Sequence, residues 1–172
     1  HITERVLKAH PQLVAVGAFC IGTNQIDLPA AAAAGVAVFN APYSNTRSVV
    51  ELALGEIITM ARRLADKNAN MHAGIWDKSA NGSHEVRGRT LGIIGYGNIG
   101  SQLSVLAEGL GMKVYFYDIV DRLALGNATR VYSLQELFEL CETITMHVDG
   151  RASNARMIGE KEFSQMRPRT LF

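Results

Sequence analysis

The chain has 172 residues, of which 48% are hydrophobic and 19% charged, with 17 Lys and Arg residues against 16 Asp and Glu residues. The length suits one domain, or one domain with part of another, with enough apolar material for a core. The even charge balance without a basic cluster excludes a nucleic-acid or anionic-membrane surface, and short apolar runs interrupted by charge argue against a membrane span.

The first third of the chain predicts a parallel strand–helix–strand unit. Residues 2–9 resemble the last turns of a helix, and the valine-rich run LVAVGAFC at 13–20 predicts a buried strand. Asp27 is the expected N-cap of a helix over 28–34, and VAVF at 36–39 predicts a second buried strand. Two buried strands joined through a helix favour parallel pairing.

A long helix is predicted after the loop NAPYSNTRS, residues 40–48, which we interpret as a crossover between domains. Ser48 and Glu51 have the spacing of a capping box that would open a helix over about 49–70. Its apolar positions cover much of the circumference. Such a helix is either buried within its own domain or contacts a second domain or subunit, and the sequence leaves both possibilities open.

The second half alternates strands with helices. After a surface connector at 71–90, the pattern predicts strands at 91–94, 113–117, 130–132 and 143–148, helices at 98–110, 134–140 and 160–166, and a further strand from Thr170. Ser133 and Glu136 form a second capping-box pattern at the start of the 134–140 helix. This alternation is typical of an α/β fold with a doubly wound parallel sheet of the Rossmann type.

A glycine motif stands at the joint between the 91–94 strand and the 98–110 helix. In LGIIGYGNIG the residues Gly95, Gly97 and Gly100 follow the pattern G-x-G-x-x-G. At this joint they would make a tight turn, let the backbone approach a pyrophosphate, and let the helix pack on the sheet. The amides of Asn98 and Ile99 at the helix start would then face the phosphates with the positive end of the helix dipole.

Asp118 is a second, independent sign of dinucleotide binding. It follows the strand KVYFY, 18 positions after Gly100, where an acidic residue accepts hydrogen bonds from the adenosine ribose. A carboxylate there repels a 2′-phosphate, so NAD is favoured over NADP, although Arg122 lies nearby. Asp118 could instead serve only as a cap at the strand end.

The cysteines and histidines predict neither a disulfide nor a metal site. Cys20 and Cys141 lie in apolar segments and are expected to be two buried thiols of a protein in a reducing, cytoplasmic compartment, with a disulfide as the alternative. The five histidines show no spacing typical of metal ligands.

Several long stretches resemble one known family. IGTNQIDLPAAAAAGVAVFNAPYSNTRSVVELALGEI, LGIIGYGNIG, YFYDI and GNAT are similar to the D-2-hydroxyacid dehydrogenases, and among them to members that act on 3-phospho-D-glycerate. The resemblance implies NAD-dependent oxidation of that acid to 3-phosphohydroxypyruvate, the first step of serine biosynthesis. It also implies that residues 1–45 end a flavodoxin-like substrate-binding domain, and that residues 46–172 form an incomplete NAD-binding domain whose first helix makes a homodimer or tetramer contact.

The resemblance also implies roles for single residues. Asn98 and Ile99 match backbone contacts to the pyrophosphate, Asp118 the ribose-binding acid, and Asn45 a position that helps to hold the substrate. His147 would lie beside the cofactor. From the residues alone, Asn45 could equally stabilise its loop, and a histidine at a strand end is commonly structural.

Two positions depart from the family pattern, and the family's catalytic residues are not found within these 172 residues. Asp149 replaces a usual proline and Arg169 a usual glycine. The family's catalytic Arg, Glu and His are expected beyond Phe172, so we expect the isolated 172-residue chain to be inactive. Another D-2-hydroxyacid dehydrogenase, or a non-catalytic NAD-binding module of the same fold, stays open as an alternative.

Overall fold

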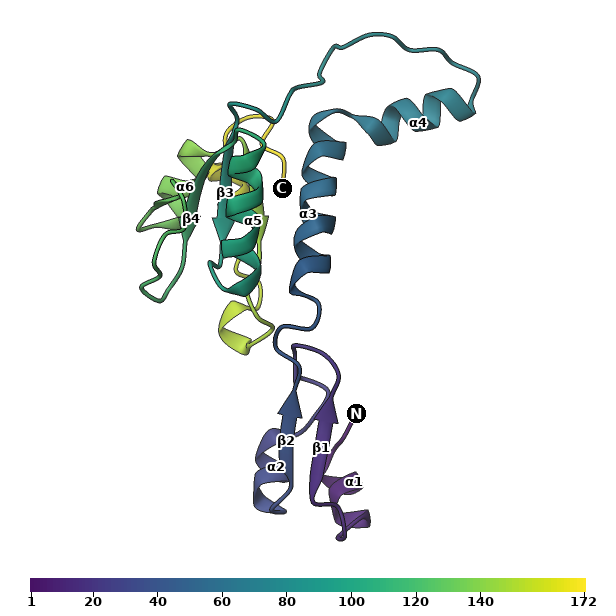
Figure 1. Ribbon diagram of the computed structural model, residues 1–172, viewed down its shortest axis with the longest axis vertical. Coiled ribbons are helices and arrows are strands. Elements are labelled where there is room, and N and C mark those ends of the chain that lie inside the picture. Colours follow the sequence, from purple (N-terminus) through teal and green to yellow (C-terminus); the bar gives the residue numbers. More distant parts are fainter. The chain divides into compact units, whose positions relative to one another are not determined.

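The computed structural model describes residues 1–172 and divides into two compact units, most of whose elements are labelled in Figure 1. The first unit comprises His1–Thr46 together with Asp149–Ala155, and the second comprises Arg47–Val148 together with Arg156–Phe172. The main chain crosses between them within the polar segment that follows Asn40.

The first unit contains the predicted strand–helix–strand arrangement. Its elements are α1 (Glu4–Ala9), β1 (Ala15–Ala18), α2 (Leu28–Ala33), β2 (Ala37–Asn40) and the 3-10 helix η1 (Ala152–Asn154). Strands β1 and β2 pair in parallel, with Ala15 opposite Ala37. The Asp27 carboxylate caps α2 by accepting a hydrogen bond from the amide of Ala30 at 3.0 Å. The predicted cap and parallel pairing are confirmed.

The prediction that both strands are buried is wrong. Only Ala18 is buried in β1, no residue of β2 is buried, and the Phe39 side chain is 64% exposed. The core of this unit centres on Leu7, Ala31 and Val36, where α1 and α2 meet the sheet. A sheet of two strands has no further strand at either edge, so an apolar sequence alone does not bury it. Cys20 is likewise only half-buried, and both cysteines are free thiols.

The second unit is built on a four-stranded parallel sheet. Its strands are β3 (Thr90–Ile94), β4 (Lys113–Tyr117), β5 (Thr129–Arg130) and β6 (Thr143–Met146), and they lie in the order β5-β4-β3-β6. All pairings are parallel. The first strand of the unit is therefore central, with later strands added on both sides, which confirms the doubly wound fold.

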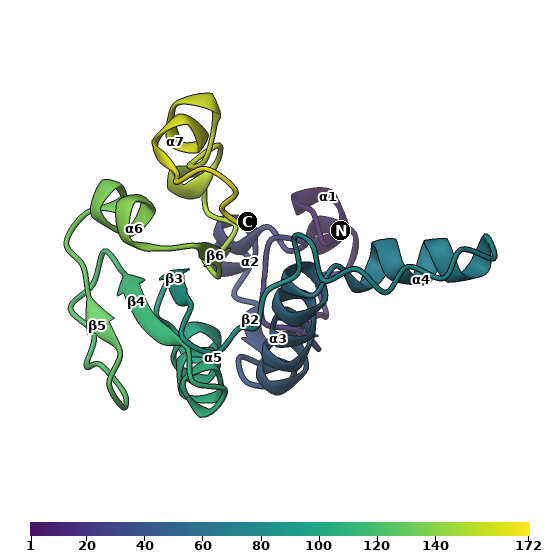
Figure 2. The same cartoon turned by 90° about the horizontal axis from the view of Figure 1, so that it is seen from above.

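Helices cover both faces of this sheet (Figure 2). The helices of this unit are α3 (Thr46–Ala61), α4 (Leu64–His72), α5 (Asn98–Gly109), α6 (Leu134–Leu140) and α7 (Glu160–Gln165). Of these, α4 has no buried residue and does not cover the sheet. Alternate residues of β4 point to opposite faces: Val114 and Phe116 join the core under α3 and α5, whereas Tyr115 and Tyr117 pack against the core under α6. Burial in this second core raises the pKa of Cys141 to about 12.

The predicted long helix is two helices, and its predicted start is wrong. Helix α3 begins at Thr46, so Ser48 lies inside it, and Glu51 pairs with Arg47 at 2.7 Å rather than capping the helix. The helix ends because Arg63 adopts a left-handed conformation with φ of 53°. That conformation is held by hydrogen bonds from the Arg63 guanidinium to Asp66 and to the carbonyl of Asn81, at 2.9 and 3.0 Å.

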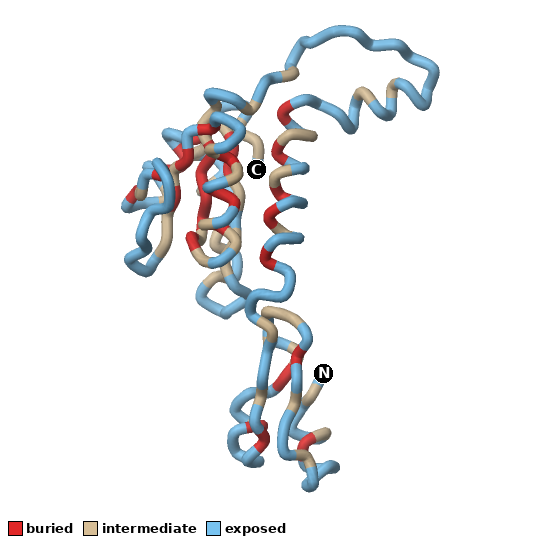
Figure 3. The backbone as a smooth tube through the Cα atoms, in the orientation of Figure 1, coloured by how far each residue is buried: buried red, intermediate tan, exposed pale blue.

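The two parts of the predicted helix differ in burial (Figure 3). Val50, Ala53, Ile57 and Ala61 form one buried face of α3, whereas Leu52 is 62% exposed. No residue of α4 is buried. The predicted wide apolar stripe is therefore a narrower one that ends with α3.

The remaining elements follow the prediction with shifts at their ends. The Ser133 hydroxyl accepts from the amide of Glu136 at 3.1 Å, but the Glu136 carboxylate accepts from the amide of Tyr132 instead of that of Ser133. Strand β6 ends at Met146, before His147. The strand expected from Thr170 is a single bridge between Leu171 and Thr143. No helix combines the length and the apolar character needed to cross a bilayer.

Candidate nucleotide-binding site

The glycine turn lies at the carboxyl ends of the central strands. Strand β3 leads through it into α5, and β3 has β4 on one side and β6 on the other. The chain leaves β3 towards β4, and β6 is added on the opposite side, so the strand order reverses at this edge. Ligands of open α/β sheets bind at such a switch point.

Two of the three glycines are required by close contacts. Gly95 has a φ of 91°, and a Cβ on it would lie 2.6 Å from the carbonyl oxygen of His147. A Cβ on Gly100 would lie 2.2 Å from the carbonyl oxygen of Gly95. The predicted roles in making the tight turn and in bringing the helix close to the strand are therefore borne out by the backbone itself.

Gly97 has a different environment, because nothing other than its chain neighbours and its own helix lies within 4 Å of the position that its Cβ would occupy. It is the N-cap of α5 and offers no side chain to the helix amides. The adjoining hollow of about 440 Å³ is lined by Gly97 and Asn98 together with Tyr96, Ser101, Arg122, Leu123 and Leu125. Free amides at the positive end of a helix beside an open hollow fit the diphosphate of a dinucleotide.

Asp118 lies next to the glycine turn and its carboxylate is already ordered. One oxygen accepts from the amide of Tyr96 at 2.8 Å and the other from the amide of Val120 at 2.9 Å, and Arg122 lies 3.7 Å away. Its side chain is only 10% exposed. The carboxylate thus acts as the cap that the sequence left open as an alternative, and each oxygen retains a lone pair with which a ribose hydroxyl could bond.

His147 follows β6 at the same edge. Its amide donates to the carbonyl of Ile94 at 2.8 Å, and its Nε2 lies 3.0 Å from the hydroxyl of Thr145. Burial lowers the pKa of the imidazole, which favours the neutral ring. The structure therefore brings together the predicted residues of the second unit, from the glycine turn to Asp118 and His147.

The remaining positions singled out in the sequence are Asn45, Asp149 and Arg169. Asn45 belongs to the first unit and is exposed. Asp149 binds the Arg151 guanidinium and the amide nitrogen of Asn154, so side-chain bonds order the segment where a proline is usual; the hydrogen bond from Arg151 lowers the pKa of its carboxyl. Arg169 has a φ of 65°, the left-handed conformation that glycine adopts most readily.

The sequence did not reveal the part played by Tyr96 and by the segment after Asp118. Tyr96 occupies a variable position of the glycine motif, yet its side chain is only 2% exposed. Arg122, Leu123 and Leu125 line the hollow from the loop between β4 and β5. The Tyr96 hydroxyl lies 2.6 Å from the hydroxyl of Ser104 on α5. The distance of eight residues between them along the chain is the one sequence signal for this contact, and it is not specific.

A second hollow of about 450 Å³ lies at the opposite edge of this unit. Its lining includes Arg89 and Glu142, at the starts of β3 and β6. These two side chains approach to 3.5 Å, so the arginine already has a counter-ion. This hollow is remote from the glycine turn and contributes nothing to the nucleotide edge.

The sheet order, the uncapped α5 and the acid after β4 define the class of protein: the second unit is a dinucleotide-binding domain of the Rossmann type. Residues 54–172 match the model of the D-isomer specific 2-hydroxyacid dehydrogenase family, NAD binding domain. The chain belongs to the D-isomer specific 2-hydroxyacid dehydrogenase family, and the predicted cofactor, NAD, is the one that this domain of the family binds.

The comparisons with individual proteins agree with the family. The chain is 56% identical to D-3-phosphoglycerate dehydrogenase of Haemophilus influenzae over 97% of its own length, and 54% identical to that of Escherichia coli over 99%. It spans 41% and 42% of the lengths of these curated relatives. Among solved structures, D-lactate dehydrogenase of Aquifex aeolicus, complexed with NAD and lactic acid, matches with a TM-score of 0.86 and 28% identity over 96% of this chain and 50% of that one.

Proposed function

We propose that the chain is the NAD-binding part of an enzyme that oxidises 3-phospho-D-glycerate to 3-phosphohydroxypyruvate, the first step of serine biosynthesis. The identity of 54–56% to two D-3-phosphoglycerate dehydrogenases, over nearly the whole chain, carries this proposal. It exceeds by a wide margin the 28% identity to the D-lactate dehydrogenase of A. aeolicus.

The nucleotide edge supports specific roles within this function. NAD, when bound, accepts the hydride from C2 of the acid. The amides of Asn98 and Ile99 bind the pyrophosphate, and the remaining lone pairs of Asp118 accept hydrogen bonds from the ribose hydroxyls. The neutral imidazole of His147 packs beside the cofactor at the end of β6. These residues bind and orient, and none of them is proposed as the acid or base of the reaction.

The first unit supplies a different part of the proposed enzyme. Residues 1–45 form the end of the substrate-binding domain, and Asn45 contributes to holding the phosphorylated acid. The exposed, polar position of Asn45 in the segment before α3 supports this role.

The choice of acid is tested by steady-state oxidation with NAD. The purified enzyme that contains this chain is supplied with 3-phospho-D-glycerate, D-lactate or D-glycerate, and kcat/KM is compared. We expect the phosphorylated acid to be preferred by orders of magnitude. Preference for an unphosphorylated acid would identify another D-2-hydroxyacid dehydrogenase, and NAD binding without oxidation of any acid would identify a non-catalytic module.

A homodimer or tetramer contact through α3 completes the proposal, in a cytoplasmic protein. Leu52, 62% exposed, lies on the face of α3 opposite its buried residues, which supports an apolar contact there. Sedimentation of the wild type and of Leu52→Glu tests it: the variant should shift towards the monomer, whereas unchanged association would place the contact elsewhere.

A further inference from the structure

The loop between β4 and β5 forms one wall of the hollow at the glycine turn, and its position depends on few contacts. At its start, the amide of Val120 donates to Asp118, and Arg130 reaches the carbonyl of Val120 at 3.4 Å. At its end, the amide of Asn127 donates to the carboxylate of Glu108 at 2.8 Å. The loop residues that line the hollow, Arg122, Leu123 and Leu125, lie between these contacts.

Within this middle part, the Arg122 guanidinium lies 3.7 Å from Asp118, and the carbonyl of Leu125 accepts from the amide of Ala128 at 3.2 Å. A further contact joins the middle part to the glycine motif. The amide of Leu125 donates to the hydroxyl oxygen of Tyr96 at 3.2 Å. The Tyr96 ring is buried and stacked on Phe116 with the centroids 3.7 Å apart and the planes at 19°. A ring fixed in this way gives its hydroxyl a defined position.

The hydroxyl of Tyr96 is part of a directed chain of hydrogen bonds. The hydroxyl of Ser104, which is fully buried, donates to the carbonyl of Ser101 at 2.8 Å. Its oxygen therefore accepts from the Tyr96 hydroxyl, at 2.6 Å, and the Tyr96 oxygen is left to accept from Leu125. Each group has its partner, so the chain rigidly connects the loop to the first turns of α5.

We propose that Tyr96 is a positioning residue for the adenosine end of the bound dinucleotide, acting through the loop that it holds. This inference rests on the proposed NAD-binding role. Tyr96 connects the two walls of the hollow: its own backbone amide binds Asp118, and its hydroxyl binds Leu125. With the loop held, the adenosine end enters a formed site and need not order the loop itself.

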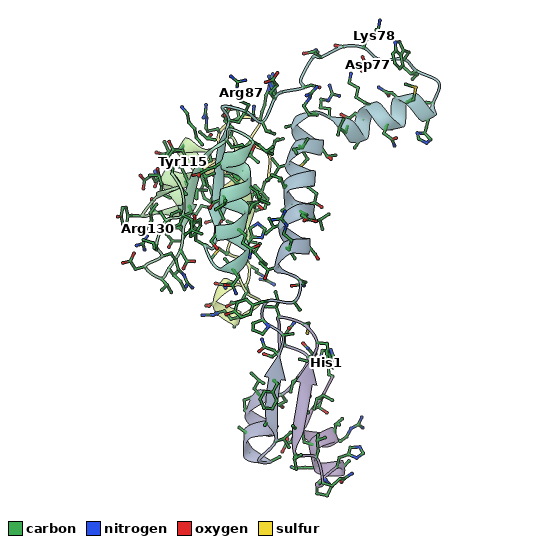
Figure 4. All side chains as sticks on the ribbon, viewed as in Figure 1. His1, Asp77, Lys78, Arg87, Tyr115 and Arg130 are labelled. Atoms are coloured by element: carbon green, nitrogen blue, oxygen red, sulfur yellow. The ribbon has the colours of Figure 1, made fainter.

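The test compares Tyr96→Phe with Tyr115→Phe. Tyr115 lies on β4, labelled in Figure 4, and packs on the opposite face of the sheet, so the control makes the same chemical change away from the hollow. Affinities are measured by titration calorimetry for NAD, ADP-ribose and nicotinamide mononucleotide. We expect Tyr96→Phe to weaken NAD and ADP-ribose by the same factor, about fivefold to tenfold, and to leave nicotinamide mononucleotide unchanged.

Several outcomes separate the proposals. If the wild type binds neither NAD nor ADP-ribose, the NAD-binding function itself fails. If it binds them and Tyr96→Phe binds them equally well, or Tyr115→Phe weakens them as much, the role of Tyr96 is overturned. A uniform weakening of all three ligands would also overturn it, because that indicates general loss of structure.

A measurement on the unmutated protein covers the case in which Tyr96→Phe does not fold. Amide hydrogen exchange should show Leu125 protected in the absence of nucleotide, whereas Leu123, 86% exposed at the tip of the loop, exchanges freely. Exchange of Leu125 as fast as that of Leu123 would show that the Tyr96 hydroxyl does not hold the loop.

Discussion

Both units contain a parallel strand–helix–strand arrangement, but only the second leaves its helix start open. In the first unit, the Asp27 carboxylate accepts a hydrogen bond from the amide of Ala30 in the first turn of α2. In the second, Gly97 stands at the same place before α5 and offers no side chain. The same local fold therefore has a helix start capped by a side chain in one unit and an uncapped helix start in the other, and the two differ in the residue at the N-cap.

The two units also differ in how their sheets are covered. Helices pack on both faces of the β5-β4-β3-β6 sheet, whereas β1 and β2 keep Phe39 and most of their other residues exposed or half-exposed. A strand is buried by the layers around it and not by its own apolar sequence. The candidate nucleotide-binding residues, from the glycine turn to Asp118 and His147, lie at the edge of the sheet that helices cover on both faces.

The largest expected effect concerns this difference in burial. Leu137 is a fully buried residue of α6, so Leu137→Ala should lower the free energy of unfolding by about 2–5 kcal/mol. The matched change in the first unit, Phe39→Ala at a side chain that is 64% exposed, should cost well under half as much. Urea unfolding followed by circular dichroism gives both values, and equal losses would show that β2 is covered in solution.

Substitutions of two glycines in the turn test whether the uncapped start of α5 binds the dinucleotide. Gly100→Ala places a methyl group 2.2 Å from a backbone oxygen and should destabilise the fold by about 2–4 kcal/mol. Gly97→Ala meets nothing within 4 Å other than its chain neighbours and its own helix, so its melting temperature should stay near that of the wild type while NAD affinity falls at least tenfold. If Gly97→Ala binds NAD normally, the diphosphate does not lie against this part of the turn.

Asp118 gives a smaller effect at the same edge. Asp118→Ala should weaken NAD binding by about 1–3 kcal/mol through lost ribose hydrogen bonds. The carboxylate also accepts hydrogen bonds from the amides of Tyr96 and Val120, so the alanine variant loses these structural bonds together with the ribose bonds. Asp118→Asn serves as the control, because its side-chain oxygen can still accept one of the two backbone bonds. Titration calorimetry that finds unchanged affinity in the alanine variant would leave Asp118 as a strand-end cap alone.

The sequence predicted some features of the fold and of the candidate site, but not others. The glycine turn and the Asp27 cap were predicted because each depends on residues close together in the chain. Asp118 was predicted because it ends a strand at a typical distance along the chain from the glycine motif. The break at Arg63 was missed because the run around it contains no glycine or proline, and because one of the two bonds from the Arg63 guanidinium goes to Asn81, on the distant connector. The contact of Tyr96 with Leu125 was missed for the same reason, since it joins residues from two different elements.

The smallest expected effect separates the two capping-box patterns of the second unit. Ser133 caps α6 through a 3.1 Å bond to the amide of Glu136, so Ser133→Ala should cost about 1 kcal/mol. Ser48 has the same Ser-x-x-Glu spacing but lies inside α3, where Glu51 pairs with Arg47, so Ser48→Ala should change stability by less than about 0.5 kcal/mol. Both changes in the free energy of unfolding are obtained from the midpoints of urea unfolding curves, provided that the dependence of that free energy on urea concentration has the same slope in both variants. A loss at Ser48 as large as that at Ser133 would mean that α3 begins at Ser48 in solution, and that the helix start nearest the crossover is capped as α2 and α6 are.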